Sequence, residues 1–142
     1  MIKIAHRGNF DGPKEIENRP VDIIVAISKG FDVEVDIRMT NSGIFLGHDS
    51  FQHEIDEEFI KDIKKHTWFH CKNIEALGYF TNVMPDARFF WHDNDDYTLT
   101  SNGYIWTYPG KTITNKSIVV VQDKTDLSIF EGAYAVCSDY LL

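Results

Sequence analysis

The chain has 142 residues, of which 43% are hydrophobic and 13% aromatic, so it is long and apolar enough for one domain with a substantial core. Its 14 lysine and arginine residues face 22 aspartate and glutamate residues, which gives a net charge of −8. This balance argues against a nucleic-acid-binding protein, which needs a basic surface, and against electrostatic docking on anionic membranes.

Two further features concern the setting of the protein. No stretch approaches the roughly 18 apolar residues that a membrane span needs, and Met1–His6 lacks the pattern of a signal peptide. Cys71 and Cys137 lie in separate apolar segments without metal-ligand spacing. We therefore expect two free, buried thiols rather than a disulfide, and a cytoplasmic location.

The first half of the chain alternates strand-like and helix-like patterns. The strand-like runs are Ile2–Arg7, Phe31–Met39, Ile44–Gly47 and Thr67–Lys72, and the helical patterns are Pro20–Lys29, Asp56–His66 and Asn73–Tyr79. The turn at residues 40–43 predicts a hairpin between the second and third runs. Strands that alternate with helices predict an α/β protein with a mainly parallel sheet.

The second half keeps the strands but loses the helices. Its apolar runs are Arg88–His92, Tyr104–Tyr108, Ile118–Val121 and Tyr134–Ser138. Residues 93–103 are near the minimum length for a helical crossover, and a full (β/α)₈ barrel takes roughly 250 residues. The sequence therefore predicts, over residues 1–142, a single domain that forms a reduced (β/α) TIM-type barrel or a partly open sheet, with helices missing in the second half.

An acidic strand is the first candidate for a functional site. Asp32, Glu34 and Asp36 alternate with apolar residues, so they share one face of the strand. They would face water on an antiparallel strand, but in a barrel this face points inward, where catalytic groups gather. Carboxylates two residues apart lie roughly 6.5 Å apart along a strand, within reach of one hard cation. We therefore expect Glu34 and Asp36 to bind a metal ion.

Two histidines fall at strand ends near this acidic strand. His6 ends the first run and is followed by Arg7, whose planar guanidinium can bind a phosphoryl group. His48 follows the third run, and Asp49 beside it could fix its tautomer. A lone histidine is more often structural than catalytic, but two at neighbouring strand ends make a catalytic pair the better hypothesis.

Three later residues carry weaker signals. His70 and Lys72 share one face of the fourth run, where Lys72 could neutralise a phosphate or could be an ordinary surface lysine. His92 stands before an acidic tract, residues 93–96, that fits a solvated loop as well as a cavity wall. None of the three indicates a function by itself.

Taken together, these motifs resemble the glycerophosphodiester phosphodiesterase family. The matching motifs, in order, are His6-Arg7-Gly8, Glu17-Asn18, Glu34-x-Asp36, Thr40-x-x-Gly43 and His48-Asp49. Weaker similarity continues through His70-Cys71-Lys72, Ile105-Trp106-Thr107 and the segment 135–139. The resemblance covers residues 1–50 well and reaches both ends of the chain.

The resemblance implies a metal-dependent phosphodiesterase that acts on a small phosphodiester, with His6 and His48 as acid and base in an order that stays open. It implies a divalent metal, Mg²⁺ or Ca²⁺, on Glu34 and Asp36. Arg7 and Lys72 would contact the phosphate and Trp106 would line the pocket. His70 stands where the family has a third carboxylate ligand; imidazole suits Zn²⁺ or Mn²⁺ better than Ca²⁺, so these two metals stay open.

Two other functions remain open at the level of the sequence. Phospholipases of the sphingomyelinase D type resemble the same family and release a cyclic phosphate. A non-catalytic protein that binds a phosphate ligand would fit the short chain and the histidine at position 70. Whatever the function, a reduced barrel would leave strand edges exposed, and a homodimer is one way to cover them.

Overall fold

The computed structural model describes residues 1–142. Ten strands alternate with three α-helices and two 3₁₀ turns. In chain order the elements are β1 (Ile2–His6), α1 (Pro20–Ser28), β2 (Asp32–Met39), β3 (Ile44–Leu46), β4 (His53–Ile55), α2 (Glu57–Ile63), η1 (Lys64–His66), β5 (Thr67–Cys71), α3 (Ile74–Val83), β6 (Arg88–Phe90), β7 (Tyr97–Leu99), β8 (Ile105–Thr107), β9 (Ser117–Val121), η2 (Leu127–Phe130) and β10 (Ala135–Ser138).

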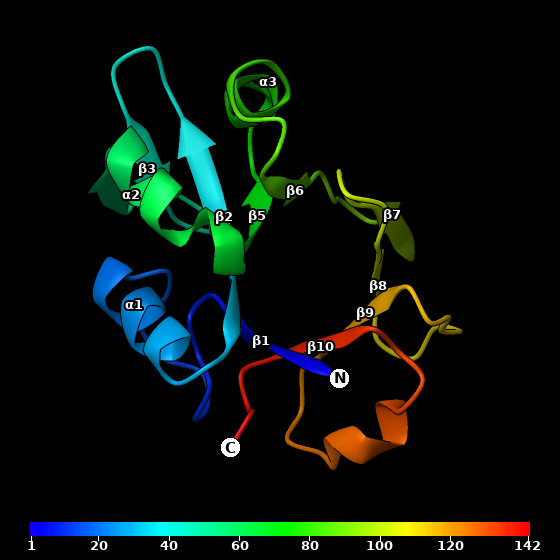
Figure 1. Ribbon diagram of the computed structural model, residues 1–142. Coiled ribbons are helices and arrows are strands. Elements are labelled where there is room, and N and C mark those ends of the chain that lie inside the picture. Colours follow the sequence, from blue (N-terminus) through cyan, green and yellow to red (C-terminus); the bar gives the residue numbers. More distant parts are fainter.

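The strands form one mixed sheet that curls around a central axis (Figure 1). Strands β6, β5, β2, β1, β10, β9 and β8 pair in parallel in that order. The first and last of the ten strands are therefore neighbours. Strands β3 and β4 extend the C-terminal part of β2 as an antiparallel hairpin and its continuation. The expected α/β fold and the hairpin after β2 are both present.

The sheet does not close by a complete ladder of hydrogen bonds. Strand β7 pairs antiparallel with β8, and no ladder joins β7 to β6. Ser101 bridges this seam: its backbone N–H donates to the Phe89 carbonyl at 2.8 Å, and its hydroxyl accepts from the Phe89 N–H at 2.9 Å. The fold is thus a curled, mostly parallel sheet with one reversed strand, which is compatible with a reduced barrel and short of a complete TIM-type barrel.

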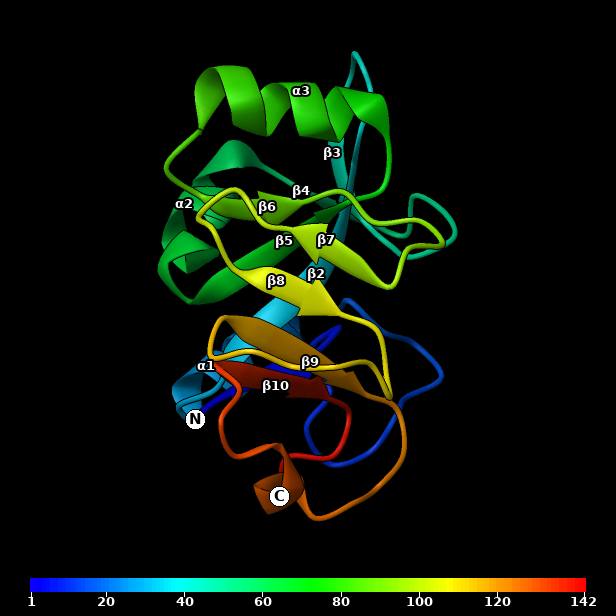
Figure 2. The same cartoon turned by 90° about the vertical axis from the view of Figure 1, so that its right-hand side faces the viewer.

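The α-helices cover only the first half of the sheet. Helices α1 and α3 pack against β2, and α3 also against β5 and β6, around a core that includes Val33, Val35 and Ile37. Strands β7 to β10 carry no α-helix on their outer side (Figure 2). There, Leu127 and Phe130 of the turn η2, together with Ala133 and Ile113, pack on β9 and β10. The expected loss of helices in the second half is present.

Short polar signals set the helix boundaries. The Asp56 carboxylate accepts the Phe59 N–H at the start of α2, and the Asn73 side chain accepts the Ala76 N–H at the start of α3. Helix α3 continues to Val83, four residues beyond the expected end.

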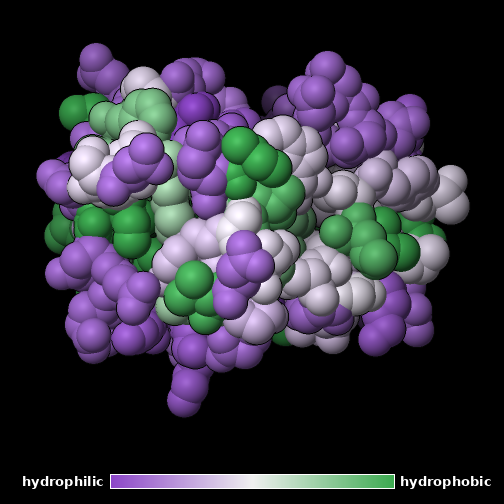
Figure 3. All heavy atoms as spheres, turned by 90° about the horizontal axis from the view of Figure 1, so that it is seen from above, coloured by the Kyte–Doolittle hydropathy of each residue, from purple (hydrophilic) through white to green (hydrophobic).

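Seen from the side that carries α3, the surface shows hydrophobic atoms only in scattered groups (Figure 3). No helix is both long and apolar enough to cross a membrane.

The end of the curled sheet at the N-termini of its parallel strands is filled by aromatic and charged side chains. Trp68 is fully buried there, and its indole N–H donates to the Asp32 carboxylate at 3.1 Å. Arg88 donates to the same Asp32 oxygen at 3.1 Å and lies 4.4 Å from the Trp68 ring centre. Tyr104 and Tyr134 pack edge-on against this indole. This plug leaves the opposite end, at the carboxyl ends of the strands, as the place for a cavity.

Candidate active site

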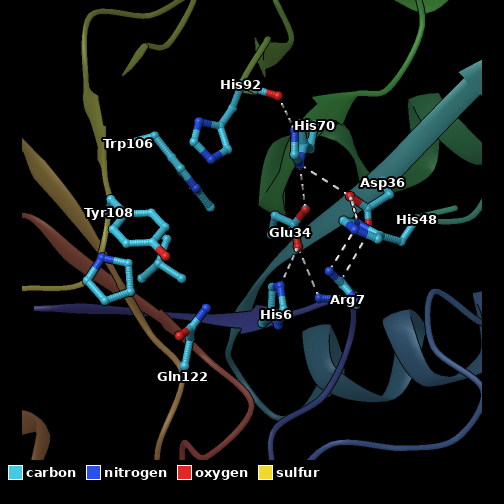
Figure 4. Close-up of a pocket in the computed structure, with 12 residues that line it drawn as sticks. His6, Arg7, Glu34, Asp36, His48, His70, His92, Trp106, Tyr108 and Gln122 are labelled. Atoms are coloured by element: carbon cyan, nitrogen blue, oxygen red, sulfur yellow. Dashed lines mark hydrogen bonds and ion pairs between the residues drawn. The ribbon is translucent and has the colours of Figure 1, made fainter. Parts of the chain in front are cut away.

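A cavity of about 150 Å³ opens among residues near the carboxyl ends of the parallel strands. Its walls differ in character (Figure 4): charged side chains from β1, β2, β5 and the adjoining loops gather on one side, and neutral side chains from β8, β9 and the loops after them on the other. The lining residues are His6, Arg7, Glu34, Asp36, His48, His70, His92, Trp106, Tyr108, Pro109, Val120 and Gln122.

The alternation of β2 and its register with neighbouring strands bring the charged groups together. Glu34 and Asp36 are almost fully buried and point to the inner face, while Val33 and Val35 face the helices. Strand pairing places His6 beside Glu34 and His70 beside Asp36. Because paired residues of parallel strands point to the same face, the two carboxylates and the two imidazoles converge.

His70 and the two carboxylates form a group that could hold a metal ion. Nδ1 of His70 lies 3.2 Å from Oδ1 of Asp36 and 3.7 Å from Oε1 of Glu34. One potential ligand atom from each of the three residues lies within 4.8 Å of the others. Oδ1 of Asp36 is buried and forms no hydrogen bond of good geometry, although Nδ1 of His70 and Nδ1 of His48 lie 3.2 and 3.3 Å away. Two buried carboxylates and an imidazole that converge in this way are donors that fit a divalent cation.

The charge states of this group follow from its contacts. Burial opposes charge on His70 and on Asp36. The nearby carboxylates of Asp36 and Glu34 nevertheless raise the pKa of His70 to about 9. Conversely, His48, His70 and Arg7 hold the pKa of Asp36 well below its usual range despite its burial. Without a metal, His70 is thus an imidazolium between two carboxylates. A bound metal would take the place of that proton.

His6 is held by a carboxylate from the last strand. Its Nδ1 lies 3.0 Å from Oδ1 of Asp139, just after β10, and its Nε2 lies 3.9 Å from Oε2 of Glu34. Burial lowers the pKa of His6, but the hydrogen bond to Asp139 and the charge of Glu34 raise it above its ordinary value overall. Since a carboxylate can only accept, Nδ1 of His6 carries a proton and Nε2 is left for the cavity.

The contact between His6 and Asp139 was not predicted from the sequence. Segment 135–139 matched the last strand of the family, but nothing in its residues tied Asp139 to a histidine 133 positions away. Asn9, which is buried, supports the contact by donating to Asp139 at 2.9 Å and to Glu17 at 2.6 Å. Only the pairing of the first and last strands brings these groups together.

Arg7 connects the carboxylates to the second histidine. Its backbone adopts a left-handed conformation (φ 54°), unusual for a residue other than glycine. In this conformation the N–H donates to Glu34 at 3.2 Å, while the guanidinium donates to Glu17 at 2.9 Å and lies 3.3 Å from Asp36. Nη2 also contacts Nδ1 of His48 at 3.0 Å. Much of the donor capacity of Arg7 thus orients the site itself.

His48 is placed by the loop that follows β3. Gly47 precedes it at φ 155°, and a Cβ there would lie 2.0 Å from the Ser50 carbonyl oxygen, so only glycine fits. Arg38 donates to the carbonyls of Gly47 and His48 and fixes the loop on β2. The His48 ring then lies with Nδ1 at 3.3 Å from Oδ1 of Asp36. Asp49, expected to fix the tautomer, is highly exposed and 3.6 Å from Nε2.

The remaining sequence candidates occupy different places. Trp106 lines the neutral wall and stacks on Phe90 with ring centres 4.3 Å apart. His92 also lines the cavity, with its ring near His70 and hydrogen-bonded to Asp95. Lys72 follows β5 and is not among the lining residues, so a phosphate contact for it stays a prediction. Tyr108 and Gln122 line the cavity but carried no specific signal for a site in the sequence.

Comparison with known proteins bears on the fold. No protein-family model and no curated protein matches the chain. A crystal structure from Galdieria sulphuraria, provisionally assigned as a glycerophosphodiester phosphodiesterase, aligns over 99% of this chain and 94% of its own, with a TM-score of 0.53 and 10% identity. A glycerophosphodiester phosphodiesterase from Parabacteroides distasonis aligns over 97% and 92%, with a TM-score of 0.50 and 12% identity.

The chain shares the fold of these phosphodiesterases. The resemblance expected from the sequence is therefore confirmed at the level of the fold. At 10–12% identity the comparison does not by itself carry an activity over to this chain. The chemistry has to be argued from the cavity.

Proposed function

We propose that the protein is a metal-dependent phosphodiesterase that hydrolyses a glycerophosphodiester-type substrate to an alcohol and a phosphomonoester. One observation carries this proposal: four residues from three separate segments, His6, His48 and the pair Glu34 and Asp36, line one cavity in a fold shared with solved glycerophosphodiester phosphodiesterases. In this reading residues 1–142 act as one phosphodiesterase-like domain.

The residues would divide the work as follows. Glu34, Asp36 and His70 would hold the metal, which supplies Lewis-acid activation of a phosphoryl oxygen when bound. One of His6 and His48 takes the proton from a substrate hydroxyl next to the phosphodiester, and that oxygen attacks phosphorus. The other protonates the alcohol as it leaves. Water then opens the resulting cyclic phosphate to the phosphomonoester, with the two histidines in exchanged roles.

The phosphate would be held in a site that is already charged. Arg7 keeps donors beyond those used by Glu17 and His48, since its guanidinium carries five N–H groups, and it lines the cavity. With Arg7 and the metal on one wall, an anionic substrate can enter despite the net charge of −8. The alcohol would then lie against Trp106 and Tyr108 on the neutral wall.

Hydrolysis of glycerophosphocholine by the full chain, measured with a panel of divalent metals, tests the proposal. Because acid–base steps contribute roughly 10²–10⁴-fold each, His6→Ala and His48→Ala should each lower kcat by about that factor. Undiminished turnover in both variants would reject the assigned roles. Phosphorus NMR of the products separates hydrolysis from release of a persistent cyclic phosphate, and glycerol phosphate binding without turnover under any metal would identify a binding protein instead.

A further inference from the structure

The group of Glu34, Asp36 and His70 contains one nitrogen donor, the His70 imidazole, whose orientation is fixed by its surroundings. Nε2 of His70 lies 3.4 Å from the backbone carbonyl oxygen of His92, which can only accept a hydrogen bond. The ring stacks on Phe90 with centres 4.8 Å apart and planes 17° from parallel, and is largely buried. Nδ1 is therefore the nitrogen that faces Glu34 and Asp36 (Figure 4).

This arrangement is typical of histidines that bind metals. Such histidines usually donate their second ring N–H to a backbone carbonyl or a carboxylate, which fixes the tautomer and makes the other nitrogen a better ligand. In this protein the carbonyl of His92 takes that part. Because a main-chain atom serves as the acceptor, the His92 side chain is not needed for it.

A second observation points to a cation at the same place. Oδ2 of Asp36 accepts from the Asn18 side chain at 3.0 Å, whereas Oδ1 is buried, forms no hydrogen bond of good geometry and has Nδ1 of His70 and Nδ1 of His48 at 3.2 and 3.3 Å. The Asn18 carbonyl oxygen in turn accepts the backbone N–H of Asp36 at 2.9 Å, so the carboxylate cannot turn freely. Oδ1 is thus held toward His70 and Glu34.

The donor set decides which ion suits this group. Ca²⁺ and Mg²⁺ take oxygen ligands almost exclusively, and their binding grows with the number of carboxylates. Here two carboxylates and one imidazole form the group, and the Arg7 guanidinium lies 3.3 Å from Asp36, which offsets part of the negative charge. Imidazole nitrogen instead favours Zn²⁺ and neighbouring first-row transition metals.

We propose that the site formed by Glu34, Asp36 and His70 selects a first-row transition metal, Zn²⁺, Co²⁺ or Mn²⁺, over Mg²⁺ and Ca²⁺. The inference rests on the metal site of the proposed function and adds its ion class. His70 is the residue that determines the selectivity, because it supplies a nitrogen donor without negative charge, and its ring is held in place by Phe90 and the His92 carbonyl.

Metal binding can be followed without any substrate. The EDTA-treated full chain is titrated with Co²⁺, whose visible absorption reports bound ligands, and separately with Zn²⁺, Mn²⁺, Mg²⁺ and Ca²⁺ while thermal unfolding is recorded. The wild type should develop Co²⁺ absorption bands, and Zn²⁺ and Mn²⁺ should raise Tm at concentrations at least about tenfold below those that Mg²⁺ or Ca²⁺ require.

Variants assign the selectivity to His70. His70→Glu should lose the Co²⁺ bands and shift the preference toward Mg²⁺ and Ca²⁺, whereas His92→Gln, which removes the other imidazole beside His70, should keep the order of the wild type. Glu34→Gln should weaken binding of every ion. Circular dichroism of each metal-free variant checks that it is folded, and His70→Gln replaces His70→Glu if the latter does not fold; it should weaken Zn²⁺ most.

Two outcomes would overturn the inference: Ca²⁺ or Mg²⁺ binding to the wild type as tightly as Zn²⁺, or an order of metals that the replacement of His70 leaves unchanged. These results are independent of turnover. Tight Zn²⁺ binding without hydrolysis would reject the proposed function and keep the metal preference. Hydrolysis together with an order of metals that is the same in the wild type and in the His70 variant would keep the proposed function and reject the metal preference.

Discussion

Asp139 is the residue that holds the ring of His6 in place. Its carboxylate is the partner that raises the pKa of His6 and fixes the proton on Nδ1. It touches the histidine rather than the cavity, so it acts as a positioning residue for His6. The sequence contained the residue but not the contact, because the contact depends on the pairing of β1 with β10.

Replacing this carboxylate should change both the rate and the pH dependence. In Asp139→Asn the pKa of His6 should fall, because the raising contact loses its charge while the lowering effect of burial remains. The limb of the pH–rate profile that reports His6 should therefore move to lower pH, and kcat should drop by more than tenfold but by no more than the roughly 10²–10⁴-fold expected for His6→Ala.

The matched control for this variant lies beside the other histidine. Asp49 is 3.6 Å from Nε2 of His48, yet 93% of its side chain is exposed. Asp49→Asn should change kcat less than about twofold, because solvent screens the interaction of an exposed carboxylate. An unshifted pH profile in Asp139→Asn would show that the contact only supports the fold.

Gly47 determines the place of His48 by a steric demand. In Gly47→Ala the new Cβ would overlap the Ser50 carbonyl oxygen, so the loop would have to move and carry His48 with it. We expect a loss of about 1–3 kcal/mol in the free energy of unfolding and a fall in kcat/KM. Chemical denaturation and steady-state kinetics measure the two effects.

Gly103 provides the comparison for this prediction. It also has a positive φ, 87°, but a Cβ there would meet nothing within 4 Å. Gly103→Ala should therefore cost only the backbone strain of about 1–2 kcal/mol and leave kcat/KM unchanged. Equal effects on kcat/KM in the two variants would contradict the steric account of the His48 loop.

At the scale of the elements, the sequence predicts the long strands and the helices well. The alternation of residues 32–38 is regular, and the burial of Glu34 and Asp36 on the inner face follows from the strand period and the helices that cover the other face. The elements that were not predicted are short. Strands β4 and β7 span three residues each, too few to show a period, and η2 is a single turn.

Some residues of the site can also be found from local sequence patterns, whereas others reach the cavity only through the three-dimensional fold. Glu34 and Asp36 can be found in the sequence because they alternate with apolar residues, and His6 and His48 because each stands at the end of a strand-like run. The neutral wall cannot be found in this way. Gln122 follows β9 and Tyr108 follows β8, and their approach to the cavity depends on how far the sheet curls.

The plug at the opposite end of the sheet allows stability to be tested apart from activity. Asp32→Ala removes the acceptor for the buried Trp68 N–H and for Arg88. It should lower the free energy of unfolding by about 1–3 kcal/mol and change kcat less than about twofold, since Asp32 does not line the cavity. Urea denaturation and kinetics of the same preparation test both halves of this prediction.

Lys116→Ala is the control for the plug. The ammonium of Lys116 lies 4.9 Å from the centre of the Tyr104 ring, but Lys116 is exposed. Its replacement should therefore lower the free energy of unfolding by no more than about 1 kcal/mol. A similar loss of stability in both variants would mean that the Asp32 hydrogen bonds add little to the surface contacts around them.

For the whole molecule, the uneven distribution of helices predicts uneven local stability. The core around β2 and β5 is covered by α1 and α3, whereas β7 has no helix and no ladder to β6. Native-state hydrogen exchange should therefore be fastest in the amides of β7 and β8 and slowest in β2 and β5. Uniform protection across all strands would show that the Ser101 bridge closes the sheet as firmly as a ladder.

The direction of β7 has a consequence for the length of chain that this part of the fold needs. A parallel strand brings its carboxyl end to the rim, and with it any functional side chain placed there, but a reversed strand brings its amino end. With β7 reversed, residues 91–96 turn the chain at the rim and residues 100–104 turn it again at the opposite end, so that β8 runs back to the rim. No crossover helix is needed. That position of the ring contributes no strand-end group. Because the three-residue strand β7 runs in the reverse direction, residues 91–104 join two parallel strands without a helix, and this part of the fold needs fewer residues than a parallel strand with its crossover would.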